Sequence, residues 1–137
     1  MKNWLGKCLR QAAWAPLAVF VFYVVAAKGF DAYIRYPWLD MPTHFVGGAA
    51  ITYFFLVGIA QSEAQLGPIP RPVQLALSLG LTAITAVVWE FLEFASDVAL
   101  GTKMNLGVSD TLSDLFFGLL GGVVVIACYR KTTRLTS

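Results

Sequence analysis

Charged residues are scarce in this sequence. Only 13% of the 137 residues are Asp, Glu, Lys or Arg, whereas 58% are hydrophobic. Water-soluble domains carry charge on about a quarter of their residues, so this composition excludes an ordinary soluble domain and favours a protein that resides in a lipid bilayer. The net charge is only +2. We expect membrane lipid, and no nucleic acid, as a partner.

Cysteine and histidine are also rare. The two cysteines, Cys8 and Cys128, lie near the two ends of the chain. We predict that both ends are cytoplasmic, so we expect reduced thiols and no disulfide. No Cys-x-x-Cys or Cys-His spacing indicates a structural zinc site. The single histidine, His44, also argues against a ferritin-like di-iron site, which uses two Glu-x-x-His pairs.

Long apolar runs, in contrast, are abundant. Four of them are long enough to cross about 30 Å of hydrocarbon at about 1.5 Å per helical residue. We therefore predict an all-α fold, with residues 1–137 forming a single integral membrane domain and a four-transmembrane-helix bundle. The predicted spans cover residues 11–27, 42–60, 73–98 and 111–129.

The ends of the spans leave alternatives open. The basic segment 2–10 and the apolar run after it would also fit a cleaved signal peptide, but Trp14 and Pro16 favour a retained first helix, with the proline in its first turn. Residues 61–72 contain a glycine and three prolines, which predict a turn. Residues 29–39 hold two tyrosines and a tryptophan, which favour membrane anchoring over a platform for substrate.

The distribution of charge predicts the orientation. Basic residues accumulate in short cytoplasmic segments, and seven of the ten flank or connect the spans on the side of the two termini. We therefore predict that both termini are cytoplasmic and that the protein lies in the cell inner membrane. Seven of the eight acids, all except Glu63, then lie at or near the outer face, against three basic residues, which gives that side a net charge of −4. Protons or a bound cation are expected there.

The third predicted span carries three of these acids. Glu90, Glu93 and Asp97 lie within roughly 60° of one another on a helix, and Ala83 and Ala86 continue the same stripe. A charge deep in hydrocarbon costs about 2.5 to 3.5 kcal/mol, so carboxylates at these positions need a functional or structural reason.

The second and fourth spans repeat this arrangement. Asp40 and His44 are four residues apart and share a helix face, as do Asp110 and Asp114. Glycines follow on each face, and small residues let membrane helices approach closely. We predict that the three helices bring seven side chains into one polar pocket just beneath the outer surface: Asp40, His44, Glu90, Glu93, Asp97, Asp110 and Asp114.

Three motifs follow one another along these spans: His44-Phe45-x-Gly47-Gly48 after Asp40, Trp89-Glu90-x-x-Glu93, and Asp110-Thr111-x-x-Asp114. In this order they resemble the YjdF family of small prokaryotic membrane proteins and are similar to the wider VanZ-like group. The VanZ-like pattern has an Asn where this sequence has Asp114, so the YjdF resemblance is closer, and the glycopeptide resistance associated with VanZ is not carried over. The resemblance implies an integral membrane protein with no assigned reaction.

One imidazole and several carboxylates suit a divalent metal: Mg²⁺, Mn²⁺ or Ca²⁺, or Zn²⁺ with mixed ligands. All seven pocket residues are candidate metal ligands, and His44, Glu90 and Glu93 are the candidate catalytic residues. Such a site could act on a lipid-linked phosphate or pyrophosphate headgroup by hydrolysis or transfer, with His44 or Glu93 as general base. Three serines are weaker candidates for a nucleophile: Ser96, Ser109 and Ser113.

Two other functions remain open. The acids could relay protons or cations, but polar residues toward the cytoplasmic side are few, which favours a one-sided pocket. The protein could also be an accessory subunit with a buried polar network. Several pocket residues have structural explanations, since Asp40 and Asp110 fit helix caps and a histidine at a polar helix end is often only hydrogen-bonded. Glu90 resists such explanations best, because it lies on the order of 10 Å from the end of its span.

Overall fold

The computed structural model describes residues 2–134, and all regular structure in that range is helical. Three long helices, α4 (Asp40–Leu66), α5 (Arg71–Leu100) and α6 (Val108–Arg134), are long and apolar enough to cross a membrane. The predicted all-α membrane fold is confirmed. The side chains of residues 2, 3 and 130–134 lie outside the description. They include four of the seven basic residues behind the predicted orientation, which stays a prediction.

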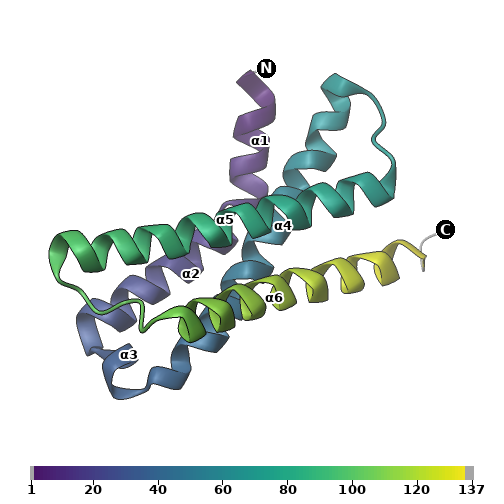
Figure 1. Ribbon diagram of the computed structural model, residues 1–137. Coiled ribbons are helices and arrows are strands. Elements are labelled where there is room, and N and C mark those ends of the chain that lie inside the picture. Colours follow the sequence, from purple (N-terminus) through teal and green to yellow (C-terminus); the bar gives the residue numbers. More distant parts are fainter. Residues whose placement is uncertain (1, 135–137) are drawn as a thin grey trace.

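Helix α4 is the centre of the arrangement. Helices α5 and α6 run side by side in opposite directions, and α4 crosses both of them (Figure 1). Helix α1 (Lys2–Ala12) packs against the C-terminal half of α4, and α2 (Trp14–Val24) packs against its N-terminal half. Every other long helix therefore contacts α4.

Glycines allow α4 and α6 to cross in backbone contact. A Cβ atom at Gly48 would overlap the carbonyl oxygen of Gly118, and one at Gly121 would overlap the carbonyl oxygen of Phe45. A Cβ at Gly122 would lie 2.6 Å from the hydroxyl of Thr52. No residue larger than glycine fits at Gly48 or Gly121 unless the helices separate.

The first span is bent, whereas the sequence predicted one helix over 11–27. The segments Trp4–Ala12 and Trp14–Gly29 meet at an angle of 51°. Pro16 explains the break, because it has no N–H to donate to the carbonyl of Ala12 and its ring would clash with that carbonyl in a straight helix. The pair makes a fourth membrane crossing if it acts as one broken span. Beyond α2 the chain continues as a π-helical turn, η1 (Val25–Gly29).

Two short helices, α3 (Ala32–Arg35) and η2 (Pro37–Leu39), connect η1 to α4. Tyr36 and Trp38 are exposed, as expected of membrane anchors, but Tyr33 is half-buried and its hydroxyl bonds with that of Thr43 over 2.9 Å. Burial raises the pKa of the Tyr33 phenol, so it stays protonated at neutral pH. Tyr33 therefore ties this connection to α4.

The turn between α4 and α5 is shorter than predicted. Helix α4 continues through Leu66, and only residues 67–70 are non-helical, because 61–66 contains no glycine or proline. The Glu63 carboxylate closes the turn: one oxygen accepts hydrogen bonds from the Ile69 backbone N–H (2.8 Å) and the Gln74 amide (2.9 Å).

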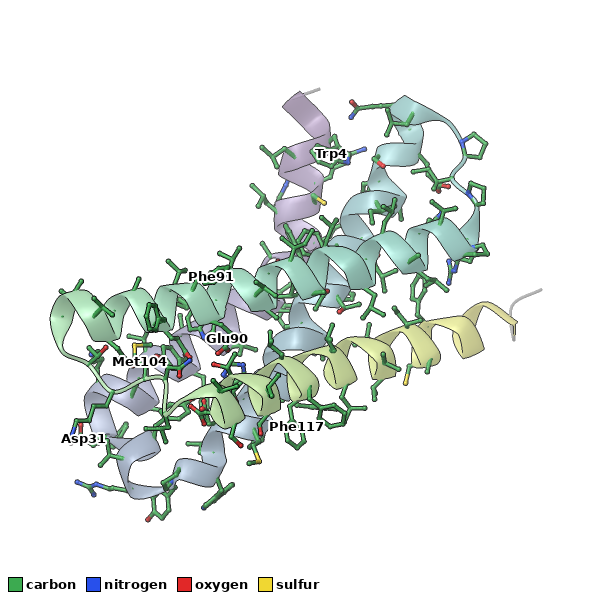
Figure 2. The ribbon with its side chains drawn as sticks, in the orientation of Figure 1. Trp4, Asp31, Glu90, Phe91, Met104 and Phe117 are labelled. Atoms are coloured by element: carbon green, nitrogen blue, oxygen red, sulfur yellow. The ribbon has the colours of Figure 1, made fainter. Side chains whose placement is uncertain are left out.

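The outer surface is apolar and much of the interior is small or polar. Phe91 is 68% exposed on the outer side of α5, whereas its neighbour Glu90 points inward to α6 and is 6% exposed (Figure 2). Thr52, Ser78 and Thr82 are almost fully buried. This inversion is expected where lipid surrounds the helices, because apolar side chains gain nothing by leaving hydrocarbon.

Candidate functional site

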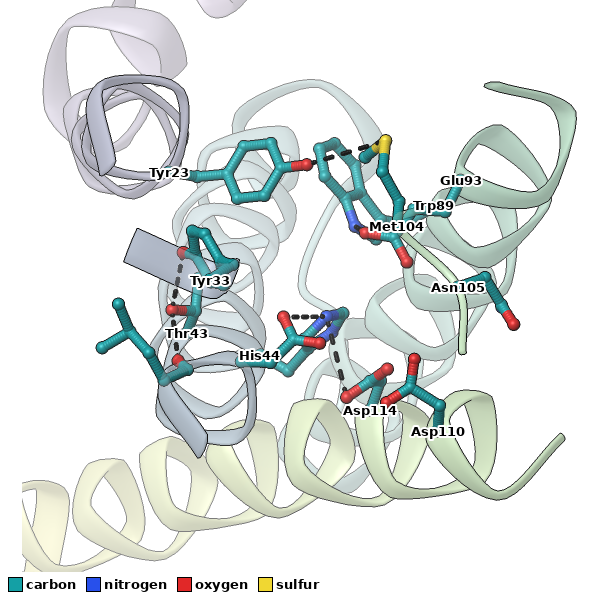
Figure 3. Close-up of polar contacts among 12 residues, drawn as sticks. Tyr23, Tyr33, Thr43, His44, Trp89, Glu93, Met104, Asn105, Asp110 and Asp114 are labelled. Atoms are coloured by element: carbon teal, nitrogen blue, oxygen red, sulfur yellow. Dashed lines mark hydrogen bonds and ion pairs between the residues drawn. The ribbon is translucent and has the colours of Figure 1, made fainter. Parts of the chain in front are cut away.

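An ionisable cluster lies where α4 begins, α5 ends and α6 begins. Each of these three helices contributes two ionisable residues that its sequence spaces three or four positions apart, so that both members of a pair face the same way. Figure 3 shows His44 between the Asp114 carboxylate and the residues of α5. We call the following set the acidic pocket: Asp40, His44, Glu90, Glu93, Asp110 and Asp114.

Four of these residues form a first group with metal-like spacing. One ligand atom from each of His44, Glu90, Glu93 and Asp114 lies within 4.8 Å of the other three. Metal–oxygen distances of about 2.0–2.6 Å place ligand atoms on opposite sides of an ion about 4–5 Å apart. The spacing therefore fits one divalent cation, held by one nitrogen and three oxygen ligands.

Asp40, Asp110 and Asp114 form a second group with the same spacing. Asp114 belongs to both groups. Nε2 of His44 lies 3.5 Å from one oxygen of Asp40 and 3.9 Å from one oxygen of Asp114. The imidazole is thus placed between the two groups.

Two oxygens of the pocket are buried without a hydrogen-bond partner. They are Oε2 of Glu93 and Oδ2 of Asp114, in residues that are 4% and 2% exposed. A buried polar atom without a partner costs about 1–3 kcal/mol, and more when the group is charged. The other oxygen of Glu93 accepts a 2.8 Å hydrogen bond from the Trp89 indole. These two oxygens are therefore the atoms of the pocket at which a ligand would compensate for a missing hydrogen bond.

Positive charge to balance the pocket is lacking among the described side chains. Among the residues whose side chains are described, the only ion pairs of the pocket carboxylates are those of His44 with Asp40 and Asp114. Ionised carboxylates buried without a counter-ion are costly. A divalent cation would supply both the charge and the missing partners.

Asp97, which the sequence placed in the same pocket, lies outside both groups. Its carboxylate accepts hydrogen bonds from the backbone N–H groups of Met104 (2.8 Å) and Asn105 (2.9 Å) and from the Thr102 hydroxyl. Helix α5 ends at Leu100, and Gly101, with φ of 67°, turns the chain back over the helix end. Asp97 therefore organises the loop 101–107, and we leave it out of the ligand set.

Asn105 also contacts the pocket, although no sequence pattern indicated it. Its amide donates to the Thr111 hydroxyl over 2.6 Å and lies 3.5 Å from a carboxylate oxygen of Glu90. It connects the loop to the pocket. A single amide between two loop glycines is too weak a pattern to have found it.

The three candidate serines have ordinary surroundings. The hydroxyls of Ser96 and Ser113 donate to the carbonyls of Leu92 and Ser109, four residues earlier in the same helix. Ser109 itself is exposed at the start of α6. None of these contacts activates a nucleophile, which would need an adjacent base.

A cavity of about 240 Å³ lies next to the pocket. Its walls come from α2, α4, α5 and α6 and are largely apolar, and His44 of the pocket and Trp89 are among its lining residues. Gly47, Gly48 and Gly118 also line it, so the small-residue stripes both join the helices and leave this space.

Polar side chains continue along the buried face of α5 away from the pocket. Gln74, Ser78 and Thr82 are each at most 6% exposed, and the Thr82 hydroxyl bonds with that of Thr52 over 2.8 Å. The sequence made these residues look sparse, yet the structure turns all of them inward.

The chain matches no curated protein and no solved structure. Residues 5–134 match the family model described as "Predicted membrane protein (DUF2238)". The predicted YjdF resemblance is consistent with this match, whereas the wider VanZ-like likeness stays a prediction. The chain therefore belongs to the family of predicted membrane proteins described as DUF2238.

Proposed function

We propose that the protein is a metal-dependent enzyme that hydrolyses or transfers a lipid-linked phosphate headgroup at the outer leaflet of the inner membrane. One observation carries the proposal. Glu93 and Asp114 each have a buried oxygen without a hydrogen-bond partner, and both residues belong to a group of side chains whose spacing suits a cation. In a purely structural network the buried carboxylate oxygens are hydrogen-bonded to other groups of the protein. Such a network would not leave these two oxygens without a partner.

The residues divide into ligands and supporting groups. His44, Glu90, Glu93 and Asp114 would hold the metal, and the Trp89 indole orients Glu93 through its hydrogen bond. A bound divalent cation would polarise a phosphoryl oxygen and lower the pKa of a bound water. His44 or Glu93 would accept the proton from the attacking water or hydroxyl, through its ring nitrogen or carboxylate oxygen that does not bind the metal.

The surroundings favour an amphiphilic substrate. The charged pocket lies near one end of three membrane-crossing helices, and the adjoining cavity is largely apolar. A phosphate at the metal and an alkyl chain along the cavity would satisfy both environments. A freely soluble phosphate ester would use only the first.

The test combines metal analysis with activity. Purified protein should contain a bound divalent metal by mass spectrometry and release phosphate from a phospholipid-phosphate or isoprenoid-pyrophosphate in detergent. Glu90→Gln and His44→Ala should each lower both metal content and rate by at least about tenfold. Asp31→Asn is the matched control, since Asp31 is an exposed acid outside both groups, and it should change neither. A metal-free parent that is inactive with every added divalent metal would refute the proposal.

A proton or cation carrier is the second candidate, and the buried polar face of α5 favours it. Gln74, Ser78 and Thr82 extend from the α4–α5 turn toward the acidic pocket. Flux of protons or Mn²⁺ into vesicles, abolished by Thr82→Val and Glu90→Gln, would establish this function in place of the first. Inertness in both assays, together with lower stability of the pocket variants, would leave the accessory-subunit role.

A further inference from the structure

The two groups of candidate metal ligands in the acidic pocket share a single residue. Asp114 offers an oxygen to His44, Glu90 and Glu93 on one side and to Asp40 and Asp110 on the other. A carboxylate has two oxygens and can bridge two cations. Asp114 is also only 2% exposed, and its Oδ2 has no hydrogen-bond partner among the described residues, so this oxygen is free to bind a ligand.

We propose that the pocket binds two divalent cations, bridged by the Asp114 carboxylate, with His44, Glu90 and Glu93 completing one site and Asp40 and Asp110 completing the other. The inference rests on the proposed function and deepens it. Paired cations stabilise both the attacking and the leaving oxygen of a phosphoryl group, so the substrate class is a phosphate or pyrophosphate ester that contacts both ions.

The charge of the pocket favours two ions over one. Its five carboxylates carry five negative charges when all are ionised, and His44 is its only basic side chain. One divalent cation leaves most of this charge unbalanced, whereas two neutralise four of the five. In a low-dielectric setting the difference is large, because repulsion between buried charges is weakly screened.

The two sites differ in access. Glu90 and Glu93 are buried, whereas the Asp40 side chain is 24% exposed and Asp110 is half-buried. Asp110 is fixed by a 2.8 Å hydrogen bond from the Leu106 backbone N–H to one of its oxygens. The first site is therefore enclosed and the second lies at the mouth of the pocket. The ion at the second site should exchange faster and leave coordination positions for the phosphate.

The decisive experiment counts manganese ions. Full-length protein in detergent is stripped with a chelator, loaded with Mn²⁺, freed of excess metal and analysed by mass spectrometry and electron paramagnetic resonance. The parent should hold two Mn²⁺ per chain with a spin-coupled spectrum. Asp40→Asn should hold one, with an uncoupled spectrum, because it removes a ligand from the second site only. Asp114→Asn should hold fewer than one.

Controls make each outcome informative. Asp31→Asn should retain two ions, and unchanged gel-filtration profiles will show that the variants fold. One ion per chain in the parent, unaffected by Asp40→Asn, would overturn the two-ion inference and leave the proposed function standing. No ion in the folded parent would overturn both.

Discussion

At the turn between α4 and α5, a single Glu63 oxygen accepts two hydrogen bonds, and at the far end of α5 the Asp97 carboxylate accepts three. Glu93 on α5 and Asp114 on α6, in contrast, each have a buried oxygen without a hydrogen-bond partner. The first pair of carboxylates is satisfied by the chain itself. We propose that a ligand completes the second pair, so that this difference separates acids that hold the fold from acids that are available for chemistry.

The largest expected effect concerns the helix crossing on which the pocket depends. Gly48→Ala would place a methyl group in the backbone of Gly118, so α4 and α6 must separate. We expect a loss of about 3 kcal/mol or more in the free energy of unfolding, measured by titration with denaturing detergent, together with loss of metal binding.

Gly80→Ala is the matched control, because a Cβ at Gly80, within α5, meets nothing within 4 Å. Its unfolding free energy should stay the same or rise slightly. If Gly48→Ala is equally harmless, the backbone crossing does not hold the pocket together.

Glu63→Ala tests the satisfied side of the comparison. It removes the acceptor for the Ile69 N–H and for the buried Gln74 amide, so we expect a cost of about 1–2 kcal/mol in unfolding free energy. Metal content should not change. A loss of metal in this variant would show that the α4–α5 turn and the acidic pocket are not independent.

Asp97→Asn should loosen the loop without emptying the pocket. An amide oxygen replaces a carboxylate that accepts from Thr102, Met104 and Asn105. Backbone amides of residues 102–107 should therefore exchange their hydrogens for deuterium several-fold faster, as measured by mass spectrometry, while metal binding persists. If metal is lost and exchange is unchanged, Asp97 is a ligand after all.

Glu93→Gln in metal-free protein should have the smallest effect on stability. The glutamine amide oxygen can still accept the hydrogen bond from Trp89, and the substitution removes a buried ionisable group that lacks a partner. In the presence of a chelator, the free energy of unfolding should therefore be equal to or above that of the parent. A loss as large as that of Glu63→Ala would mean that Glu93 already has a structural partner.

The sequence predicts the gathering of pocket residues better than it separates their roles. Helical spacing alone places Asp40 with His44 and Asp110 with Asp114, and glycines mark the faces that meet. Spacing also placed Asp97 in the pocket, because nothing in the helix pattern reveals that the chain reverses at Gly101 and returns its N–H groups to that carboxylate. Long-range hydrogen bonds of this kind depend on the loop path, which periodicity does not encode.

Other departures have similar causes. Pro16 was placed correctly in a first helical turn, but the helix that precedes it carries too many polar residues to read as part of a span, so the bend went unpredicted. The prolines near α5 suggested a long turn, yet Pro72 fits the first turn of that helix. These two departures concern a bend within the first span and the length of a turn, whereas the apolar runs predict the long helices themselves.

The unpartnered oxygens of Glu93 and Asp114 are, we propose, ligand positions. Thermal unfolding of the chelator-treated protein, with and without a large excess of Mn²⁺, tests this directly, because a ligand that binds only the folded state raises its melting temperature. We predict a rise of about 5 °C or more in the parent and in Asp97→Asn, and none in Glu93→Gln or Asp114→Asn. An unchanged melting temperature of the parent with Mn²⁺, Mg²⁺, Ca²⁺ and Zn²⁺ alike would contradict the claim.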